Sequence, residues 1–399
     1  MSGPLEGVKV VDFSQVVSGP FCGMLLADQG AEVIKIEPTS GVGDMIRGLA
    51  SFAKGGFAAL FINNNRGKKC VGLDLSQDEG REIALELCKD ADVVLENFRP
   101  GAMTRLGLDY EAVAAINPDV IYCSISGFGS TGPYANRPSL DPVIQGLTGI
   151  VDRQMNPEIP FPDLVRNLIA DKSTSFTAAQ AISAALFARE RGKGGQNIEV
   201  PMLDSAMYFF WNDGMMDQTV LDDDATGGWL LATVYRLTDC KDGKLVYFVA
   251  SDAMRVALFN ALGHPEWGED PRFASMEALS QEGNFEAMGT LVAERFLELT
   301  VDEALAALIE HEVPSGPILA AEAAIQDVQA VHNRTVRQFD HPEAGTIQGA
   351  HPAARFSKTD IEMAQWFSAR GGDNAEVLAS IGKSAEDIAA LEAAGVIGS

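Results

Sequence analysis

Hydrophobic and polar positions follow two different periods in the amino-terminal half of the chain. Short apolar runs, some of them strictly alternating, predict β-strands at residues 8–13, 31–37, 92–95 and 120–124. Helical patterns lie between and after them, at residues 19–29, 110–116 and 172–191. Ser76 and Glu79 form a capping-box pattern for a further helix that reaches about Lys89. Strands that alternate with helices predict an open, mainly parallel α/β sheet.

The pattern changes after about residue 225. Residues 222–228 are rich in Asp and Gly and predict a linker, and two strand patterns at residues 230–237 and 244–250 flank an Asp-Gly turn. Helices follow, one opened by the capping box of Thr300 and Glu303. We therefore expect a large α/β domain of residues 1–220, completed by residues 330–399, and a small α+β domain of residues 225–329.

Composition narrows the class of protein. The 399 residues are 46% hydrophobic and 22% charged, which is typical of a globular chain. A formal net charge of −26 disfavours nucleic acids and anionic membranes as partners. The chain has no apolar run long enough for a transmembrane helix and no signal-peptide pattern at its start. Five scattered cysteines without a C-x-x-C pair indicate reduced thiols, so we expect a cytoplasmic protein.

One glycine-rich segment resembles a nucleotide-binding loop. Gly127-Phe-Gly129-Ser-Thr-Gly132 follows a predicted strand, but Pro133 and Pro138 come next, and no helix opens there as a phosphate site requires. We interpret the segment as a turn. Neither a P-loop nor an H-E-x-x-H motif occurs, and the five histidines all lie late in the chain without metal-ligand spacing. We therefore expect neither an ATP site nor a metal site.

A series of sequence blocks provides the most specific signal. They occur in order along the first half of the chain, with a weaker one at residues 313–317: Asp12–Pro20, Leu26–Glu37, Gly43–Arg47, Asn65–Lys69, Leu73–Leu75, Glu96–Gly101, Ser126–Pro133, Asp141–Gly146 and Ala170–Gln196. In these blocks the chain resembles the class III coenzyme A (CoA) transferases, which include the formyl-CoA and carnitine CoA-transferases. The resemblance implies a Rossmann-like large domain and a homodimer of interlocked subunits. It also implies an enzyme that moves CoA from an acyl-CoA thioester to a free carboxylic acid.

Asp171 is the candidate nucleophile. By its position alone it is an N-cap for a helix that begins at Lys172. The resemblance implies that its carboxylate attacks the thioester, forming first a mixed anhydride and then an aspartyl-CoA thioester. A helix amino terminus stabilises an ionised carboxylate, so the two roles are compatible. Every intermediate stays activated, and the reaction therefore requires neither ATP nor a metal.

The resemblance also implies where CoA binds. It assigns CoA contacts to Val17, Ser18, Leu73, Asp74, Leu75, Ser76, Asn97, Phe98, Arg99, Arg105 and Arg137. Arginines suit phosphates because the guanidinium group donates two charge-assisted hydrogen bonds. Gln15 and Asp141 lie near the family's reaction centre. The chain departs from the formyl-CoA transferase pattern at Pro38, where that enzyme has an arginine, and in its glycine-rich loop, for which residues 226–229 are a weak counterpart.

Two other functions are compatible with the same fold. An α-methylacyl-CoA racemase needs a histidine base upstream of the aspartate, and no histidine precedes His264 here. A non-catalytic acyl-CoA-binding protein would have no use for a nucleophile, and Asp171 is present. We therefore favour the transferase.

Overall fold

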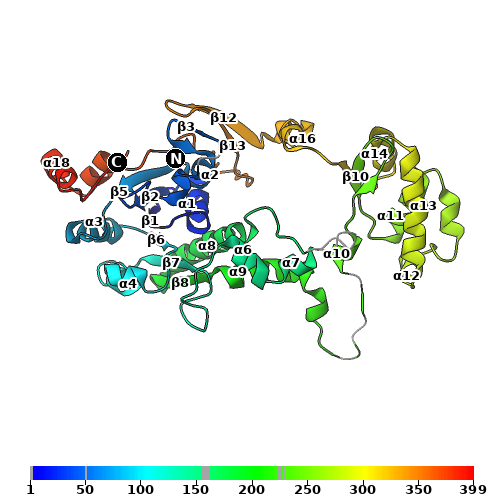
Figure 1. Cartoon of the computed structure of the whole chain (residues 1–399), viewed down its shortest axis with the longest axis horizontal. Coiled ribbons are helices and arrows are strands. Elements are labelled where there is room, and N and C mark those ends of the chain that lie inside the picture. The colour runs from blue at the N-terminus through cyan, green and yellow to red at the C-terminus, as the bar shows by residue number, and fades with distance from the viewer. Residues whose placement is uncertain (1–2, 50–51, 155–161, 223, 225–226, 229) are drawn as a thin grey trace. The chain divides into compact units, whose positions relative to one another are not determined.

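The chain folds into two compact units, residues 1–228 with 331–399 and residues 229–330. A computed structural model describes residues 3–49, 52–154, 162–222, 224, 227–228 and 230–399 (Figure 1). Each unit has a hydrophobic core of its own. The expected linker and the expected counterpart of the glycine-rich loop lie partly outside the described residues, at residues 223, 225, 226 and 229.

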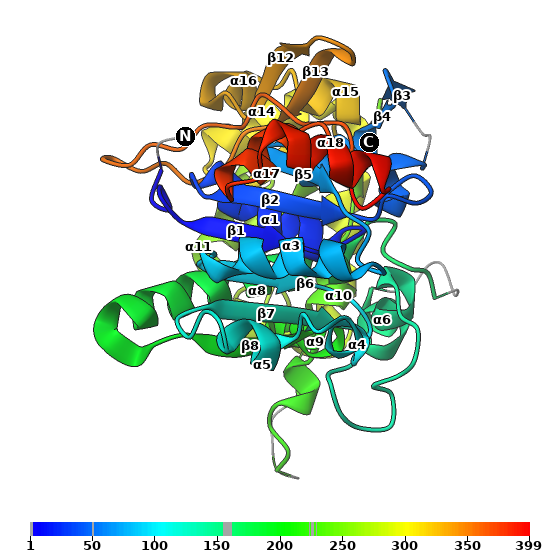
Figure 2. The same ribbon diagram turned by 90° about the vertical axis from the view of Figure 1, so that its left-hand side faces the viewer.

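A six-stranded sheet runs through the larger unit, and every pair of neighbouring strands in it is parallel. Its strands are β1 (Lys9–Asp12), β2 (Glu32–Glu37), β5 (Lys68–Gly72), β6 (Val93–Glu96), β7 (Ile121–Ser126) and β8 (Gln196–Pro201). In space they stand in the order β5-β2-β1-β6-β7-β8 (Figure 2). The order reverses between β1 and β6, which is the doubly wound arrangement. The predicted mainly parallel α/β sheet is confirmed.

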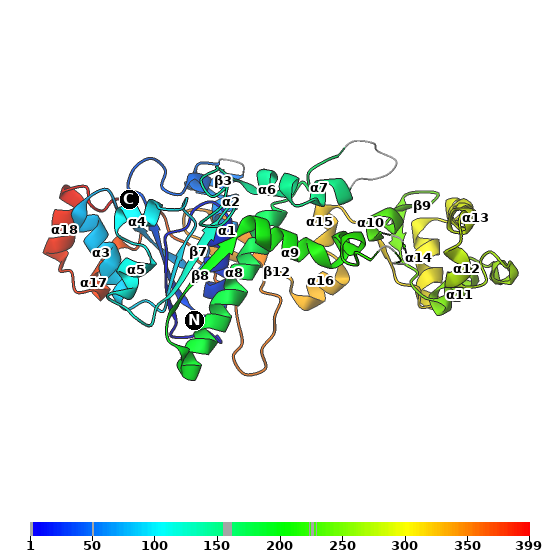
Figure 3. The same ribbon diagram turned by 90° about the horizontal axis from the view of Figure 1, so that it is seen from below.

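Alternate residues of each strand belong to cores on opposite faces of the sheet. Val10 and Val93 pack in one core and Val11 and Val94 in the other, as the two-residue period of a strand requires. Helices cover both faces (Figure 3). One core includes residues of α1 (Ser18–Asp28), α6 (Asp141–Leu147), α8 (Ile169–Ala188) and α9 (Met202–Gly214). The other includes residues of α3 (Asp78–Lys89), α4 (Ala102–Leu106), α5 (Tyr110–Ala114), α17 (Asn374–Ser380) and α18 (Ala385–Ala393).

Shorter elements complete the larger unit. They are β3 (Ala53–Lys54) paired with β4 (Phe57–Ala58), α2 (Ala59–Asn65), α7 (Ile150–Arg153), the hairpin β12 (Val336–His341) and β13 (Gly345–Ala350), the 3-10 turns Met45–Arg47 and Met216–Gln218, and the π turn Arg189–Lys193. Residues 127–132 bend, residues 133–136 form a turn, and the next helix begins only at Asp141, which agrees with the interpretation of this segment as a turn.

Two predicted helix starts were wrong. α8 begins at Ile169, and its N-cap is Leu168, which makes no side-chain cap. Asp171 is therefore the third residue of the helix rather than its cap. The capping box of Ser76 and Glu79 does not form either: the Ser76 hydroxyl donates to Asp74 at 2.7 Å, and α3 begins at Asp78. At α3, the upstream Asp74 thus takes the hydroxyl that the capping box would have used.

The smaller unit combines a three-stranded sheet with helices. Its strands β9 (Thr238–Asp239), β10 (Lys244–Tyr247) and β11 (Ser315–Pro317) are antiparallel. The helices are α10 (Leu231–Val234), α11 (Asp252–Ala261), α12 (Met276–Leu279), α13 (Asn284–Glu298), α14 (Val301–Glu310) and α15 (Ala321–Ala324), with a 3-10 turn at Pro265–Glu269; α16 (Val328–Asn333) spans the boundary. The capping box of Thr300 and Glu303 is confirmed. The strand predicted at residues 230–237 was wrong, because this segment contains α10 and only Thr238 and Asp239 pair with β10.

Candidate active site

Most of the predicted site residues follow the carboxyl ends of parallel strands. Gln15, Val17 and Ser18 come after β1, Leu73 to Ser76 after β5, Asn97 to Arg99 after β6, and Arg137 in the segment after β7. Carboxyl ends of parallel strands share one edge of a sheet, and ligands of doubly wound folds bind at this edge where the strand order reverses. Here the reversal lies between β1 and β6. The topology therefore brings these segments together along one edge.

The loop between β1 and α1 (residues 13–17, the β1–α1 loop) and Asn97 meet at this reversal point. The Asn97 Oδ1 atom accepts a hydrogen bond from the Gln15 N–H at 2.8 Å, and its Nδ2 donates to the Gln15 carbonyl at 2.7 Å. The same Nδ2 lies 3.3 Å from the Ser18 hydroxyl oxygen. Both polar atoms of the Asn97 side chain are thus engaged by the β1–α1 loop and the start of α1.

Asp171 lies in the first turn of α8 and is 7% exposed. Its backbone N–H donates to Asp141 Oδ2 at 2.9 Å. The other Asp141 oxygen accepts from Gln145 Nε2 at 2.5 Å, and the Gln145 Oε1 atom accepts from the Val165 N–H at 2.9 Å. Asp141, expected near the reaction centre, therefore fixes the backbone of the candidate nucleophile, and Gln145 connects it to the segment that leads into α8.

The environment of Asp171 makes the ionised form of its carboxyl group unfavourable. Burial, together with the nearby negative charge of Asp141, raises the pKa of Asp171 from 3.8 to about 7. Within the described part of the chain, no hydrogen-bond donor or cation contacts its side-chain oxygens. A carboxylate with little solvation and no partner is a stronger nucleophile than one in water. Such a group can attack a carbonyl carbon at neutral pH.

Ser175 connects α8 to α1. Its hydroxyl lies 2.7 Å from the Ser18 carbonyl oxygen and 2.8 Å from the Asp171 carbonyl oxygen, and the residue is fully buried. The first turns of α8 and the start of α1 therefore lie side by side. The turn of α8 that carries Asp171 therefore lies next to Val17 and Ser18.

The segment after β5 is a tight turn covered by the carboxyl-terminal residues. The carboxylate of Asp74 accepts from the Ser76 N–H at 2.9 Å, the Ser76 hydroxyl and the Gln77 amide, and these hydrogen bonds lower its pKa. Leu73 is fully buried and forms a β-bridge with Ile397. Side-chain atoms of Asp74 are thus used to shape the turn, whereas Ser76 is exposed.

The three predicted arginines are accessible to a bound anion. Arg99, Arg105 and Arg137 are exposed, and in the described ranges none of them forms an ion pair with a carboxylate. Arg137 instead stacks its guanidinium over the Tyr134 ring at 3.6 Å. Exposed cations without acidic partners are notable in a chain of net charge −26. Arg99 and Phe98 also line a cavity of about 210 Å³ at the carboxyl edge of the sheet.

Sequence reasoning assigned no role to several buried charges near this edge. Glu96, at the end of β6, accepts from the Phe98 N–H at 2.7 Å, and burial raises its pKa to about 7. A network of six buried charged residues lies beside the β1–α1 loop: Asp12, Lys35, Glu37, Asp44, Arg47 and Lys68. A sequence signal was present at Lys35, which lies between the apolar residues Ile34 and Ile36 of β2.

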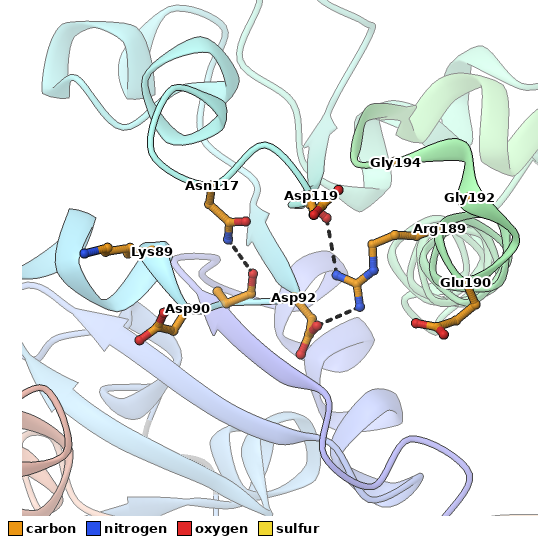
Figure 4. A pocket seen from close by; sticks show the side chains of 10 residues that line it. Lys89, Asp90, Asp92, Asn117, Asp119, Arg189, Glu190, Gly192 and Gly194 are labelled. Atoms are coloured by element: carbon orange, nitrogen blue, oxygen red, sulfur yellow. Dashed lines mark hydrogen bonds and ion pairs between the residues drawn. The ribbon is translucent and has the colours of Figure 1, made fainter.

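A larger cavity of about 600 Å³ lies at the opposite, amino edge of the sheet (Figure 4). Its polar groups are largely paired with one another: Arg189 donates to Asp92 Oδ1 at 2.6 Å, and Asn117 donates to the Ala91 carbonyl at 2.7 Å. None of the predicted site residues lines it. Most of the predicted site residues, Asp171 among them, lie along the carboxyl edge instead.

Comparison with known proteins identifies the family. Residues 5–372 match the model of CoA-transferase family III. The succinate–glutarate CoA-transferase of Agrobacterium fabrum is 31% identical over 95% of this chain and 96% of its own, and the acetyl-CoA:oxalate CoA-transferase of Acetobacter aceti is 34% identical over 84% and 86%. The crystal structure of a CAIB/BAIF family protein from Brucella suis superimposes with a TM-score of 0.80 at 33% identity, covering 96% of this chain and 100% of that one. The chain therefore belongs to CoA-transferase family III, the enzymes that transfer coenzyme A to a carboxylic acid.

Proposed function

We propose that Asp171 carries the acyl group and then CoA during transfer. Its carboxylate oxygen attacks the thioester carbonyl of the donor, the C–S bond breaks, and a mixed anhydride and CoA thiolate result. The thiolate attacks the aspartyl carbonyl and releases the donor acid, which leaves an aspartyl-CoA thioester. The acceptor carboxylate attacks this thioester and expels the thiolate. Attack of the thiolate on the acceptor's acyl carbon then forms the new acyl-CoA and regenerates the Asp171 carboxylate.

One observation carries this proposal: the carboxylate of Asp171 is buried, has no described partner and lies beside the start of α1. An aspartate used only for structure would be expected to cap its helix or pair with a cation, because a buried charge without a partner is costly. Asp141 and Gln145 orient its backbone and leave the side chain free. Neither ATP nor a metal is needed, since every intermediate is an activated acyl group.

We propose that CoA binds along the carboxyl edge of the sheet. Its phosphates would meet the unpaired cations Arg99, Arg105 and Arg137, and its thiol end would approach Asp171. The remaining contacts follow the resemblance: Val17, Ser18, Leu73, Asp74, Leu75, Ser76, Asn97 and Phe98. At Pro38 the chain has no cation, but Arg370 lies against the following loop, where it donates to the Gly41 carbonyl at 2.8 Å. We propose that Arg370 supplies the positive charge missing at Pro38.

The relatives support a dicarboxylic acid as one of the two substrates. Glutarate, succinate and oxalate, which appear in their names, each carry a second carboxylate beside the one that reacts. A purified preparation incubated with a panel of acyl-CoAs and mono- and dicarboxylates, read by mass spectrometry, tests this proposal. New acyl-CoA species formed only from monocarboxylates would contradict it.

The assembly proposed for the enzyme is an interlocked homodimer. Several large apolar side chains of α8 and α9 are exposed in the single chain, among them Phe176 at 58% and Tyr208 at 79%. An exposed apolar surface of this kind supports a protein partner, here a second copy. Light scattering on purified protein tests the dimer, and a monomer at micromolar concentration would contradict it.

The five buried, unpaired cysteines support a reducing compartment, the cytoplasm. No helix in the described part of the chain is long and apolar enough to cross a bilayer.

The two alternatives find less support. A racemase would need a histidine base near Asp171, and the chain has no histidine in its first 263 residues. Two of the three later ones in the larger unit are engaged by backbone groups: His341 contacts the Phe367 carbonyl at 3.1 Å and His351 the Pro352 carbonyl at 2.8 Å. A mere binder would release no thiol from acyl-CoA, so a burst of free thiol on mixing distinguishes the enzyme from it.

Two variants of Asp171 and one control test the proposed nucleophile. Asp171→Ala and Asp171→Asn should abolish transfer while keeping CoA binding, and hydroxylamine should trap an adduct on this residue in the wild type only. Asp204 provides a matched control, because it is the third residue of α9 just as Asp171 is the third residue of α8, but it is exposed. Asp204→Asn should transfer normally. Full activity in Asp171→Ala would overturn the assignment.

A further inference from the structure

The β1–α1 loop contains a strained residue. Val16 has a φ of 70°, in the left-handed region that β-branched residues rarely occupy. Such a conformation persists only where its surroundings enforce it, and it is concentrated at functional sites. The contacts that enforce it here come from residues distant in the sequence.

Three side chains hold consecutive residues of the loop. Lys35 donates to the Ser14 carbonyl at 2.7 Å, Asn97 binds both backbone groups of Gln15, and Asp44 Oδ1 accepts from the Val16 N–H at 3.1 Å. Lys35 and Asp44 are joined by an ion pair of 2.9 Å, and both side chains are fully buried. Every residue from Ser14 to Val16 therefore has a backbone group fixed by a side chain from another segment.

The buried charges are balanced. Asp12, Glu37 and Asp44 face Lys35, Arg47 and Lys68, so three carboxylates meet three cations. Burial opposes the charge of Lys35, but Asp44 and Asp12 hold its pKa above the ordinary value. The loop also packs tightly against α1: a Cβ atom added at Gly19 would lie 2.2 Å from the Ser14 Cβ atom.

Stability alone does not account for this arrangement. Buried ion pairs are often no more stabilising than apolar residues of similar volume, because desolvation offsets their attraction. Such a network can fix the positions of the groups it contacts. Here it contacts the β1–α1 loop, at the point where the strand order of the sheet reverses. Ser175 links the end of the loop to the first turns of α8, where Asp171 lies.

We propose that Asp44 and Asn97 are positioning residues of the transfer reaction, which hold the β1–α1 loop in its strained conformation against the first turns of α8. They act through Gln15, Val16 and Val17 and touch no reacting atom. This inference rests on the proposed role of Asp171 as nucleophile. Reacting groups displaced by about 1 Å can cost about a hundredfold in rate, so loss of an anchor should act mainly on kcat.

The test uses four variants with steady-state kinetics below the melting temperature of each. Asp44→Ala removes the acceptor of the Val16 N–H, whereas Asp44→Asn keeps a carbonyl oxygen there. Asn97→Ala releases Gln15 and leaves no buried charge unpaired, so it remains informative if Asp44→Ala does not fold. Asp28→Ala is the matched control, because Asp28 also is a buried carboxylate in an ion pair, with Arg66 at 2.6 Å, but lies at the far end of α1.

We expect Asp44→Ala and Asn97→Ala to lower kcat by about a hundredfold, and KM for acyl-CoA should change less than fivefold in Asp44→Ala, because only Asn97 of the two is also a proposed CoA contact. Asp44→Asn should recover at least tenfold of the lost rate, and Asp28→Ala should keep the wild-type kcat although its melting temperature falls. The amount of Asp171 adduct formed in one turnover should fall in parallel with kcat. Wild-type kcat in Asn97→Ala, or an equal loss in Asp28→Ala, would overturn the inference. Failure of the nucleophile assignment would appear separately, as activity in Asp171→Ala.

Discussion

Replacing Asp171 by asparagine should stabilise the folded chain at alkaline pH while it abolishes activity. The carboxylate is 7% exposed and lies near Asp141, so its negative charge is unfavourable in the folded state. Asparagine has nearly the same shape and carries no charge. The variant therefore removes a charge that destabilises the folded state but that the proposed reaction requires.

The magnitude follows from the two pKa values. An acid whose pKa is 3.8 when unfolded and about 7 when folded holds its proton longer in the folded state, so stability falls as pH rises between these values. The penalty is absent below the unfolded pKa and reaches its full size above about pH 7. About three pKa units at about 1.4 kcal/mol each amount to about 4 kcal/mol, and residual solvent contact reduces this to about 2–4 kcal/mol.

Urea unfolding at pH 5 and pH 8, at one protein concentration, measures the effect. The advantage of Asp171→Asn over the wild type should grow by about 2 kcal/mol between the two pH values, because most of the penalty develops in this interval. Asp204→Asn, at the same position of α9, should show a difference below about 0.5 kcal/mol at both. If the advantage of Asp171→Asn were the same at pH 5 and pH 8, the carboxylate would not be held in a desolvated state, and our reasoning would be wrong.

Four further outcomes are expected. Activity at limiting acyl-CoA should rise about tenfold per pH unit up to about pH 7 and level off above it, as the Asp171 carboxyl loses its proton; a profile flat from pH 5 to pH 8 would contradict this. Arg105→Ala should raise KM for acyl-CoA by about ten- to a hundredfold with little change in kcat, because a phosphate contact is the same in the ground and transition states. The control variant Arg191→Ala, beyond the end of α8 on the opposite edge of the sheet, should change neither constant. A collapse of kcat in Arg105→Ala would place Arg105 in the reaction centre instead. Gly19→Ala should destabilise the fold by about 1–3 kcal/mol and slow transfer, because the new methyl group would overlap Ser14, so wild-type kinetics would show that the loop can move freely. Transfer should survive EDTA, and activity lost to the chelator and restored by a divalent cation would contradict the proposed reaction.

Local periodicity was a reliable guide where a single stretch of chain decides the structure. The two-residue alternation of Ala31 to Glu37 predicts β2, and in the structure successive side chains of this strand point to opposite faces, so that Val33 packs in one core and Ile36 in the other. The capping box at Thr300 forms because its partner Glu303 is only three residues away. The resemblance to the family, likewise carried by consecutive residues, was confirmed over nearly the whole chain.

Predictions failed where a distant or competing partner decides the local structure. α8 begins at Ile169, upstream of Asp171, after a segment whose Val165 N–H donates to Gln145 on α6. The Ser76 cap fails because the Asp74 carboxylate takes its hydroxyl hydrogen. Such competition between acceptors depends on distances in space, which the spacing of residues along the chain does not give.

The sequence alone predicted the strands β1, β2, β6 and β7, the family and the candidate nucleophile, because each of these is written in consecutive residues; β5 and β8 were recognised only in the structure. Only the tertiary structure decided how the site is built. The reversal of strand order between β1 and β6 brings Asn97 against Gln15, eighty-two positions apart in the chain. Lys35 can be buried within β2 because Asp44 forms an ion pair with it and the Ser14 carbonyl accepts a hydrogen bond from it. A buried charge is tolerated only with its partners, and the fold alone supplies them.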